Sequence, residues 1–386
     1  IETSKKGCLS GRRQLPAGRN QWPETLQNDK IRAGESGVKH PRTTYWVLTM
    51  KQVNVAIVGA TGAVGEVMLE LLAERDFPAK AVSLLASERS AGARIPFKHQ
   101  SITVQNLAEF DFSGTDIALF SAGGSVSAEF GPKAASQGCV VIDNTSHFRR
   151  DPDIPLIVPE VNLHTLEQHK KRNIIANPNC STIQMVVALK PIYDCVGIER
   201  IHVSTYQAVS GSGKSGIEEL ATQTAKLLNA QDIESRVYGK QIAFNAVPHI
   251  NDFEENGFTK EEMKMIWETH RIFEDDSIQV SPTCVRIPVF YGHSEAVYVE
   301  TKAPLLATDA RALLSDAPGV TVLDERTSGG YPTAVTEAAG TDDVFVGRIR
   351  NDVSHPRGLH LWVVSDNVRK GAALNSIQIA EALVNE

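Results

Sequence analysis

The sequence lacks the features of two large classes of protein. No apolar run in its 386 residues approaches the ~20 residues that a helix needs to cross a bilayer. Basic residues are not in excess either, because the formal net charge is -7 and the pI is about 5.9. We therefore expect no membrane partner and no nucleic-acid partner, since a nucleic-acid-binding domain carries a basic patch. The 42% hydrophobic and 22% charged residues indicate an ordinary globular protein whose partners are small molecules.

Cysteine is also scarce. The five cysteines stand at positions 8, 139, 180, 195 and 284, with no CxxC pair and no close cluster with histidine. A chain of this length needs no disulfides to fold, and structural zinc requires such close clusters. The pattern argues against a disulfide framework and a metal site. It predicts a reducing compartment, which we take to be the cytoplasm.

Residues 1–49 differ in composition from the rest of the chain. They carry nine Lys or Arg against four Asp or Glu, and no sustained periodicity precedes Met50. They also lack the apolar segment of a secretory signal peptide. We expect a disordered or non-native extension, which is an added leader, a mis-extended reading frame or part of an organellar transit peptide.

The stretch "VNVAIVGATGAVGEVMLELLAERDFP" predicts a strand, a glycine-rich turn and an amphipathic helix that stops at Pro78. Its glycines, Gly59, Gly62 and Gly65, follow the pattern GxxGxxG, and Thr61 stands where the commonest dinucleotide fingerprint has glycine. Glycines at these places allow a tight turn, close approach to a pyrophosphate and close helix packing. We infer a dinucleotide site; a tight turn without a ligand is the alternative.

The loop after the next strand, "KAVSLLAS", bears on the choice of dinucleotide. An NAD enzyme usually places an acid there, on the ribose 2'-hydroxyl. This chain reads "SERSAG", with Arg89 between Ser87 and Ser90, and favours the 2'-phosphate of NADP. The Glu88 carboxylate is able to accept a hydrogen bond from a ribose hydroxyl, so the sequence leaves NAD as an alternative cofactor.

Two further buried strands lie in "DIALFSAGG" (116–124) and "CVVIDNTSHFRRDPDIPLIVPEVN" (139–162). Each is followed by polar or glycine residues. In open α/β sheets, ligands bind at the carboxyl ends of the strands. We expect both ends to face the ligand.

Cys180 stands at the predicted start of a helix, in "NPNCSTIQ". Apolar spacing predicts the helix from Ser181 or Thr182 to Pro191. A helix N-terminus stabilises an anion, and the thiolate is the nucleophilic form of cysteine. The stretch alone leaves open a reactive sulfur and an ordinary packed thiol.

The second half of the chain alternates longer strands and helices. Its "SGSGKSG" is no P-loop, because Ala208 stands where the first glycine is required, and we expect it to line the cofactor or substrate cleft. Arg286 and His293 lie seven residues apart and face opposite sides of a straight strand. A bend at Tyr291-Gly292 brings them into one pocket; otherwise they are a strand-face charge and a turn histidine.

Together these motifs resemble the aspartate-semialdehyde dehydrogenases of the bacterial type. The resemblance runs from Met50 to Glu386. Its signatures, in order, are "GATGAVG", "ASERSAG", "FSAGG", "DNTSHFR", "NPNCSTIQ", "YQAVSGSGKSG", "EEMK", "RIPVFYGHS" and "DNVRKGAALNSIQIAE". Their joint presence in this order is far more specific than any one of them.

The resemblance implies an α/β fold. It has an N-terminal Rossmann-like NADP-binding domain, residues 50–178, completed by a C-terminal helix, 366–386. Residues 179–365 form an α+β catalytic and dimerisation domain with a mixed sheet. The resemblance also implies a homodimer or homotetramer.

It further implies that NADPH reduces L-4-aspartyl phosphate to L-aspartate 4-semialdehyde and phosphate, in lysine, threonine, methionine and diaminopimelate biosynthesis. The nucleophile is Cys180, which forms an acyl-thioester; Gln207 orients it, and His293 is the general acid/base. The substrate-binding residues are Arg286 on the α-carboxylate, Glu261 near the amino group, Arg149 and Lys264 on the phosphate, and Asn179. The cofactor-binding residues are Gly59, Thr61, Gly62, Ala63, Val64, Ser87, Arg89, Ser90, Ser121, Gly123, Ser210, Gly211 and Asn367.

For two of these assignments, the neighbouring residue in the sequence is a second candidate. Arg150 is a second candidate for the phosphate, and Glu262 is adjacent to Glu261. We choose Glu261 because it lies three residues before Lys264, on the same helix face.

The residue types fit the chemistry. A soft sulfur displaces phosphate from an acyl phosphate, and the thioester accepts a hydride that a carboxylate does not. Histidine, with a pKa near ~6.5, is able to take the thiol proton and later return it, and a planar guanidinium suits a carboxylate. The alternatives are an N-acetyl-glutamyl-phosphate reductase, a glyceraldehyde-3-phosphate dehydrogenase and a non-catalytic dinucleotide sensor.

Overall fold

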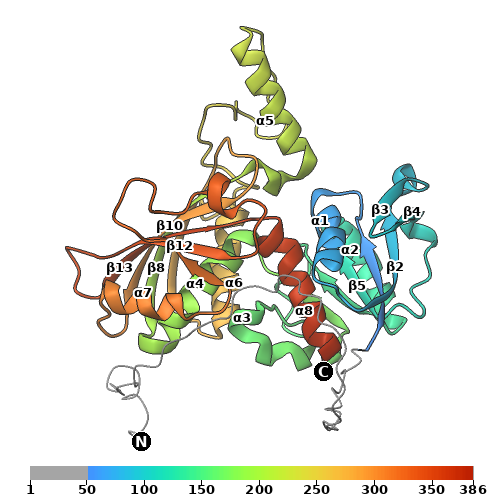
Figure 1. Ribbon diagram of the computed structural model, residues 1–386, viewed down its shortest axis with the longest axis horizontal. Helices are drawn as coiled ribbons and strands as arrows, with labels where there is room; N and C mark the ends of the chain where they lie inside the picture. The colour runs from blue at the N-terminus through green and yellow to red at the C-terminus, as the bar shows by residue number, and fades with distance from the viewer. Residues whose placement is uncertain (1–50, 386) are drawn as a thin grey trace, which may run out of the picture. The chain divides into compact units, whose positions relative to one another are not determined.

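The computed structural model describes residues 51–385, so the predicted extension at residues 1–49 lies outside the described residues. Within 51–385 the chain forms two sheets and the helices that cover them (Figure 1). No helix in this range has the length and apolar character to cross a membrane. The predicted fold class, a dinucleotide-binding α/β domain with a second mixed sheet, is confirmed.

The first sheet has seven strands in the order β3-β4-β2-β1-β5-β6-β7, all parallel except β3. Its central strands are almost continuously apolar and buried, as expected when helices cover both faces. The strands are β1 (Val53–Val58), β2 (Ala79–Ala86), β3 (Arg94–Phe97), β4 (Gln100–Asn106), β5 (Ile117–Phe120), β6 (Val140–Asp143) and β7 (Ile174–Ala176). Its helices are α1 (Ala63–Glu74), α2 (Gly124–Ser136) and α3 (Pro159–Asn162).

Two glycines of the fingerprint have steric reasons to be glycine. A Cβ on Gly65 would lie 2.2 Å from the Gly59 carbonyl oxygen, so α1 packs directly on the turn. Gly59 has φ +89°, and a Cβ added to it would lie 3.0 Å from the carbonyl carbon of Ser121. The turn therefore brings the start of α1 to the carboxyl ends of β1 and β5.

The second sheet has six strands in the order β11-β12-β13-β10-β8-β9. β8 pairs with β9, and β11 with β12, in parallel; the other pairs are antiparallel, so the sheet is mixed. The strands are β8 (Ile198–Gln207), β9 (Gln279–Arg286), β10 (His293–Thr301), β11 (Val320–Val322), β12 (Val344–Asn351) and β13 (Gly358–Ser365). The helices of this half are α4 (Cys180–Val196), α5 (Gly213–Leu228), α6 (Lys260–Phe273) and α7 (Ala307–Ser315).

α4 packs against the second sheet and against α6, and it is longer than predicted. It continues through Pro191 to Val196 and ends at Gly197, which has φ +70°. The prediction that it stops at Pro191 is wrong. Proline removes one backbone hydrogen bond, but Ile192 just beyond it is fully buried, and this packing keeps the helix intact.

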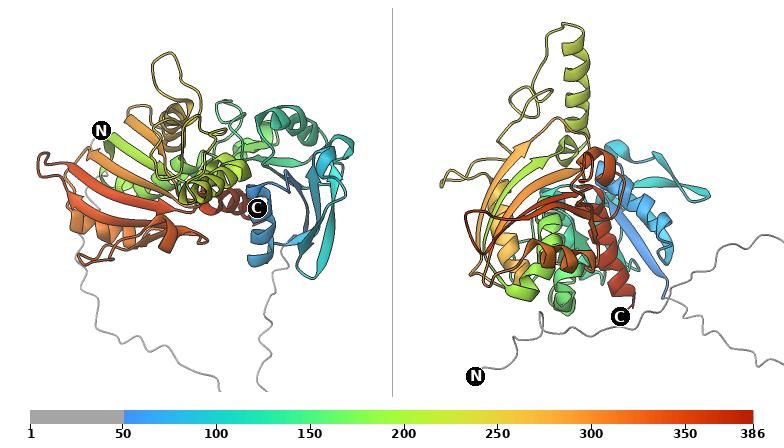
Figure 2. Two further views of the ribbon diagram at one scale, coloured as in Figure 1. Left: turned by 90° about the horizontal axis from the view of Figure 1, so that it is seen from above. Right: turned by 60° about the vertical axis from the view of Figure 1, so that its left-hand side comes forward.

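α5 projects away from the sheets, as Figures 1 and 2 show from different sides. Its base is held by a small apolar cluster of its own, which includes Leu220, Ile242 and Val247. The glycine-rich segment before it, Val209–Ser212, forms a 3-10 turn. The projecting helix is thus anchored next to the carboxyl end of β8.

The C-terminal segment returns to the first sheet. The predicted helix 366–386 is divided: a π-helical stretch, Arg369–Ala373, precedes α8 (Leu374–Asn385), which lies beside α1 (Figure 1). Lys370 in the π-helical stretch is 1% exposed. Its ammonium donates to both oxygens of Glu160 in α3, at 2.8 and 2.7 Å, and to Asn375 and Gln378. This buried ion pair ties the returning segment to α3.

We expect Lys370→Met to lower the free energy of unfolding by about 3 kcal/mol, because removing one partner leaves the buried Glu160 carboxylate unpaired. Chemical denaturation measures the effect. The double variant Glu160→Gln/Lys370→Met should regain part of the loss, and Lys80→Met, at an exposed lysine, serves as the control. Equal stability of Lys370→Met and wild type would show that the pair does not hold the segment.

Candidate active site

A cleft of about 980 Å³ lies at the carboxyl ends of β1, β5 and β8 and at the start of α4. Most of the residues predicted from the sequence line it. They are Thr61, Gly62, Ala63, Val64, Arg89, Ser121, Arg149, Asn179, Cys180, Gln207, Ser210, Gly211, Glu261, Lys264, Arg286 and Asn367. Five predicted residues do not line it, namely Gly59, Ser87, Ser90, Gly123 and His293. Gly59 shapes the turn beneath it, and His293 lies just behind the cysteine.

Cys180 is the first residue of α4, as the sequence indicated. The side chain of Asn179 caps the helix by accepting from the backbone N–H groups of Ser181 and Thr182, at 3.1 and 3.3 Å. The residue is half-buried and lines the cleft. A Cβ on Gly371, from the returning C-terminal segment, would lie 2.9 Å from the Cys180 Cβ. Only glycine at 371 leaves room for the cysteine.

His293 faces the cysteine, with 3.3 Å between its Nε2 and Cys180 Sγ. Its other nitrogen, Nδ1, accepts from the backbone N–H of Ala208 at 3.0 Å. The neutral ring therefore carries its proton on Nε2, toward the sulfur. Gly292 makes the bend that the sequence left as one of two alternatives: its φ is +88°, and an added Cβ would lie 2.6 Å from the Ala334 carbonyl oxygen. Arg286 and His293 consequently point into one region.

Burial controls the charge of both groups. It lowers the pKa of His293 to about 3, and the Arg286 charge adds to this, so the ring is neutral at working pH. Burial, with the Glu261 charge, raises the pKa of the Cys180 thiol to about 12, against the lowering by nearby cations such as Arg149. In the free site the pair is therefore a neutral thiol and a neutral imidazole.

Glu261 is the centre of a buried network. One oxygen accepts from Asn179 Nδ2 at 2.9 Å and Gln207 Nε2 at 3.1 Å; the other accepts from Asn251 Nδ2 and Lys264 Nζ, both at 3.0 Å. Burial raises its pKa, but the Lys264 charge and these hydrogen bonds outweigh it and hold the pKa at about 2. A substrate ammonium would have to replace one of the four donors.

Gln207 is oriented from both ends. Its Oε1 accepts from Thr205 Oγ1 at 2.9 Å, and its Nε2 donates to Glu261. The same Nε2 lies 3.4 Å from His293 Nε2. Two N–H donors thus face one spot beside Cys180, which is the geometry for stabilising an oxyanion.

Arg286 is 4% exposed and lines the cleft. Its Nη1 donates to the Ala208 carbonyl at 2.6 Å. Its Nε has no hydrogen-bond partner within residues 51–385. A Cβ on Gly211 would lie 2.8 Å from Arg286 Nη1, so the glycine-rich turn leaves this guanidinium accessible. A buried guanidinium with unused donors suits a carboxylate.

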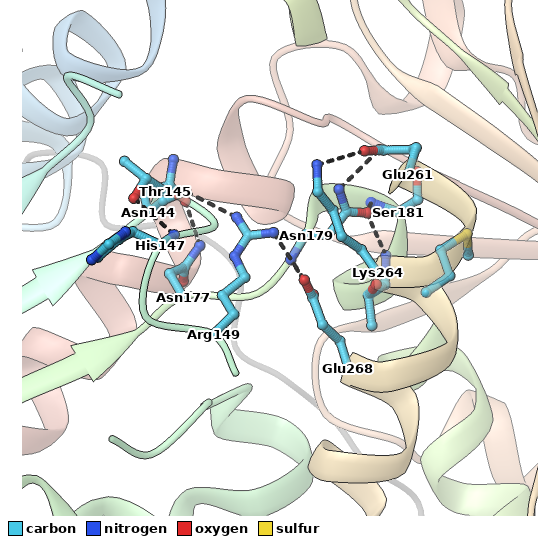
Figure 3. Close-up of polar contacts among 12 residues, drawn as sticks. Asn144, Thr145, His147, Arg149, Asn177, Asn179, Ser181, Glu261, Lys264 and Glu268 are labelled. Atoms are coloured by element: carbon cyan, nitrogen blue, oxygen red, sulfur yellow. Dashed lines mark hydrogen bonds and ion pairs between the residues drawn. The ribbon is translucent and has the colours of Figure 1, made fainter. Parts of the chain in front are cut away.

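Arg149 lies across from α6, whose residues Glu261, Lys264 and Glu268 share one face (Figure 3). Arg149 Nη1 donates to Glu268 at 3.0 Å and Nη2 to the Asn144 carbonyl at 3.0 Å. Arg149 and Lys264 both line the cleft, so the predicted pair of cations is brought together at one end of it. Arg150 does not line this cleft.

The dinucleotide side of the cleft contains the start of α1 and Arg89. Arg89 is exposed, and no ion pair engages it within residues 51–385. Asn367, at the start of the returning C-terminal segment, is held by two residues of the second half: its Oδ1 accepts from the Gly292 N–H at 2.9 Å, and its Nδ2 donates to Ser210 Oγ at 2.9 Å. Within 51–385 no cluster of three His, Cys, Asp or Glu residues is arranged to hold a metal ion.

The sequence analysis missed several residues of the site. Glu268 accepts from the Asn179 N–H at 2.6 Å as well as from Arg149. Asn177 donates to Asn144 Oδ1 at 2.6 Å and holds the loop before Arg149. The spacing of Glu268 from Glu261, two helical turns, was a usable signal. No sequence signal pointed to Gly371, because its role depends on the packing of a segment that is distant along the chain.

A second pair of polar residues lies beneath the first. Gln184 follows Cys180 by one helical turn, and Glu295 follows His293 by two strand residues, so both share the faces of the pair above. Glu295 is 0% and Gln184 1% exposed. Within 51–385 neither side chain makes a hydrogen bond of good geometry. Burial raises the pKa of Glu295 well above its usual range, against the lowering by the Gln184 amide.

Two family models match the chain. The model described as "Semialdehyde dehydrogenase, NAD binding domain" matches residues 54–169, and "Semialdehyde dehydrogenase, dimerisation domain" matches residues 189–370. These ranges cover most of the first and second sheets, respectively.

The chain is also similar to named proteins. An aspartate-semialdehyde dehydrogenase of Legionella pneumophila is 62% identical over 336 residues, which cover 87% of this chain and 97% of that protein. The crystal structure of aspartate semialdehyde dehydrogenase II from Vibrio cholerae complexed with ASA matches with a TM-score of 0.86 and 60% identity, over 87% of this chain and 99% of that one. The crystal structure of aspartate semialdehyde dehydrogenase with NADP from Candida albicans matches with a TM-score of 0.69 and 27% identity, over 86% of this chain and 98% of that one.

We expect Glu295→Gln to stabilise the protein more at pH 8 than at pH 5.5. A carboxyl with a raised pKa keeps its proton on folding, so wild-type stability falls as pH rises above the unfolded pKa of about 4.3, by up to about 1.4 kcal/mol per pH unit. Glutamine removes this dependence. Denaturation at the two pH values measures the difference, with Glu300→Gln on the same strand as the control. Parallel pH dependence of Glu295→Gln and wild type would show that Glu295 is ionised in the fold.

Proposed function

The chain belongs to the aspartate-semialdehyde dehydrogenase family, and from this membership we propose how its site performs the family's reaction. The protein catalyses reductive dephosphorylation of L-4-aspartyl phosphate to L-aspartate 4-semialdehyde with a nicotinamide dinucleotide, and phosphorylating oxidation in reverse. The reaction serves amino-acid biosynthesis.

The observation that carries the proposed mechanism is the contact between Cys180 and His293 at the head of α4, 3.3 Å long. Cys180 Sγ attacks the acyl carbon, the bond from that carbon to the phosphate oxygen breaks, and a thioester forms. The leaving phosphate takes the thiol proton and departs as hydrogen phosphate. The step therefore needs no separate base, in keeping with a histidine whose proton is already on Nε2. Arg149 and Lys264 offset the charge of the phosphate.

His293 and Gln207 act on the anions that follow. The dinucleotide, when bound, supplies the hydride to the thioester. The tetrahedral centre on Cys180 then carries an oxyanion, to which His293 Nε2–H and Gln207 Nε2–H donate. Collapse of this centre releases the aldehyde and leaves Cys180 as a thiolate, 3.3 Å from His293 Nε2. A proton from solvent then converts the thiolate back to the thiol. We assign His293 as the donor to both anions. This proposal does not keep the predicted role of His293 as the base for the thiol proton, because Nδ1 accepts from the Ala208 N–H and the ring proton is therefore on Nε2.

The ends of the substrate are assigned to Arg286 and Glu261. Arg286 offers unused N–H donors to the α-carboxylate. Glu261 accepts the α-ammonium in place of one of its present donors, and Asn251 is the one that lies outside the reacting centre. Asn179 holds the head of α4 and the Glu261 carboxylate together.

We assign NADP as the preferred dinucleotide. The cradle for the pyrophosphate fits, because Cβ atoms on Gly59 and Gly65 would meet backbone. Thr61, Gly62, Ala63 and Val64 line the cleft beside it. Arg89 lines the cleft with no ion-pair partner within residues 51–385, whereas Glu88 does not line it. A free guanidinium there favours a 2'-phosphate over a ribose hydroxyl.

We assign dinucleotide binding to residues 50–178 with 366–386, and chemistry and subunit contact to 179–365. We propose that copies pair as homodimers, alone or within homotetramers, through the second half, which carries the dimerisation match. The proposed mechanism requires a free thiol, which a reducing compartment preserves, and we propose the cytoplasm as that compartment.

The function is tested by phosphate-dependent reduction of NADP with L-aspartate 4-semialdehyde, beside N-acetyl-glutamate semialdehyde and glyceraldehyde-3-phosphate. We expect only the first aldehyde to be oxidised, and only with phosphate. Cys180→Ala should abolish turnover and retain NADPH binding, because the cysteine forms the covalent bond and does not hold the cofactor. Oxidation of another aldehyde, or no oxidation of any aldehyde by a protein that still binds NADPH, would refute the proposed substrate. Turnover by Cys180→Ala would refute the assignment of Cys180 as the nucleophile.

Replacing Arg89 with Ala should narrow the preference for NADP over NAD by about tenfold or more, because a charge-assisted hydrogen bond to the 2'-phosphate is lost. The ratio of kcat/KM for the two cofactors measures it. Arg94→Ala, another exposed arginine of the same half, is the control. An unchanged ratio would move recognition of the 2'-phosphate to another residue.

A further inference from the structure

A second cavity, of about 500 Å³, opens beside the phosphate end of the cleft. Three residues, Ser146, Arg149 and Lys264, line both cavities. The others that line the second cavity are Arg150, Glu254, Lys260, Trp267, Glu268, His270, Arg271 and Asp276. The two cavities thus meet at the side chains assigned to the phosphate.

The second cavity carries more positive than negative side chains. Five Lys or Arg line it, against three carboxylates. Of these carboxylates, Glu268 is already bound to Arg149 and to the Asn179 N–H. Glu254 and Asp276 make no ion pair within residues 51–385. Lys260 and Lys264 are themselves paired, with Asp252 and Glu261, and Arg271 is bound to backbone carbonyls. Arg150 is therefore the cation left to attract an anion.

Arg150 is the cation of this cavity with unused donors. Its guanidinium lies 4.1 Å from the centre of the Trp267 ring. Among the described residues no carboxylate is within ion-pair distance of it. Stacking on an indole fixes the plane of the guanidinium and leaves its N–H edge free, which is the arrangement for bidentate binding of an oxyanion.

The loop that carries Arg149 and Arg150 is held by Arg271. Arg271 donates to the backbone carbonyls of Arg149 and Ile154, and to that of Asp151 at 2.6 Å. Buried Arg149 also keeps one donor, Nε, without a partner within residues 51–385. The same loop therefore places Arg149 at the junction and Arg150 in the second cavity, and each arginine has an N–H donor that is free to bind an anion.

We propose that the second cavity is an outer phosphate site, in which Arg150 binds inorganic phosphate before it reaches, or after it leaves, Arg149 and Lys264. The proposal rests on the proposed function, which makes phosphate a product or substrate at the junction. The main cleft must hold the dinucleotide and the amino acid at the same time. A phosphate that exchanges through the second cavity requires neither of them to leave.

Initial rates of the oxidative reaction test the proposal, with phosphate as the varied substrate. Arg150→Gln should raise the KM for phosphate about two- to fivefold, the range for one exposed charge contact, and leave the KM for the aldehyde and for NADP within error. It should also flatten the dependence of kcat/KM for phosphate on ionic strength. Arg326→Gln, an exposed arginine that lines neither cavity, is the matched control. Identical behaviour of the two variants would overturn the outer site.

Substitutions of Trp267 supply an independent reading. Trp267→Leu removes the surface on which Arg150 stacks and should raise the KM for phosphate as Arg150→Gln does, whereas Trp267→Phe should retain most of the wild-type value. Equal effects of leucine and phenylalanine would contradict a stacking role.

A calorimetric titration with inorganic phosphate, without aldehyde or dinucleotide, measures the affinity of the same site in the absence of turnover. Weaker binding in Arg150→Gln than in Arg326→Gln is expected. If the aldehyde assay fails but this difference remains, the outer site stands and the proposed reaction falls. If turnover is phosphate-dependent and the difference is absent in both assays, the reaction stands and the outer site falls.

Discussion

The rest of the site depends on two carboxylates of α6 that hold the residue before the cysteine. Glu268 accepts from the backbone N–H of Asn179, and Glu261 accepts from its side-chain amide. The same amide caps α4, so the helix begins at Cys180 and not a residue earlier or later. Because a shift of one residue turns a helical side chain by about 100°, these bonds determine that the sulfur faces His293 and the cleft.

The same carboxylates balance the cations around them. Glu268 pairs with Arg149, and Glu261 with Lys264, which leaves the cations ordered and partly neutralised in the free site. Buried cations without partners would be costly. The Glu261 charge contributes to the raised pKa of the Cys180 thiol. The free site thus holds a neutral thiol among ordered cations.

The end of the chain completes the site from the other side. Asn367 contacts Gly292 and Ser210, and Gly371 leaves room for Cys180. A few residues away, Lys370 anchors this segment to α3. Lys370 and Gly371 both lie in the π-helical stretch Arg369–Ala373, a deviation of the kind that often lies at functional sites. The cleft therefore has contributions from both halves of the chain and from the returning C-terminal segment.

The sequence by itself determined the local elements and the chemical types. The glycine pattern before α1, the N-terminal position of Cys180 and the three-residue spacing of Glu261 and Lys264 were all readable, because each depends on residues within one or two turns of chain. The order of nine motifs also determined the family. The length of α4 was misread, since burial of Ile192 outweighs the hydrogen bond lost at Pro191.

Only the tertiary structure decided which neighbouring residues share a site. Arg149 enters the cleft while Arg150 turns to Trp267, and Glu261 rather than Glu262 faces Asn179, although each pair is adjacent in sequence. The proton of His293 is placed by the backbone N–H of Ala208, 85 residues away. Such choices depend on contacts between segments distant along the chain, whose packing and hydrogen bonds carry no periodic signal in the sequence.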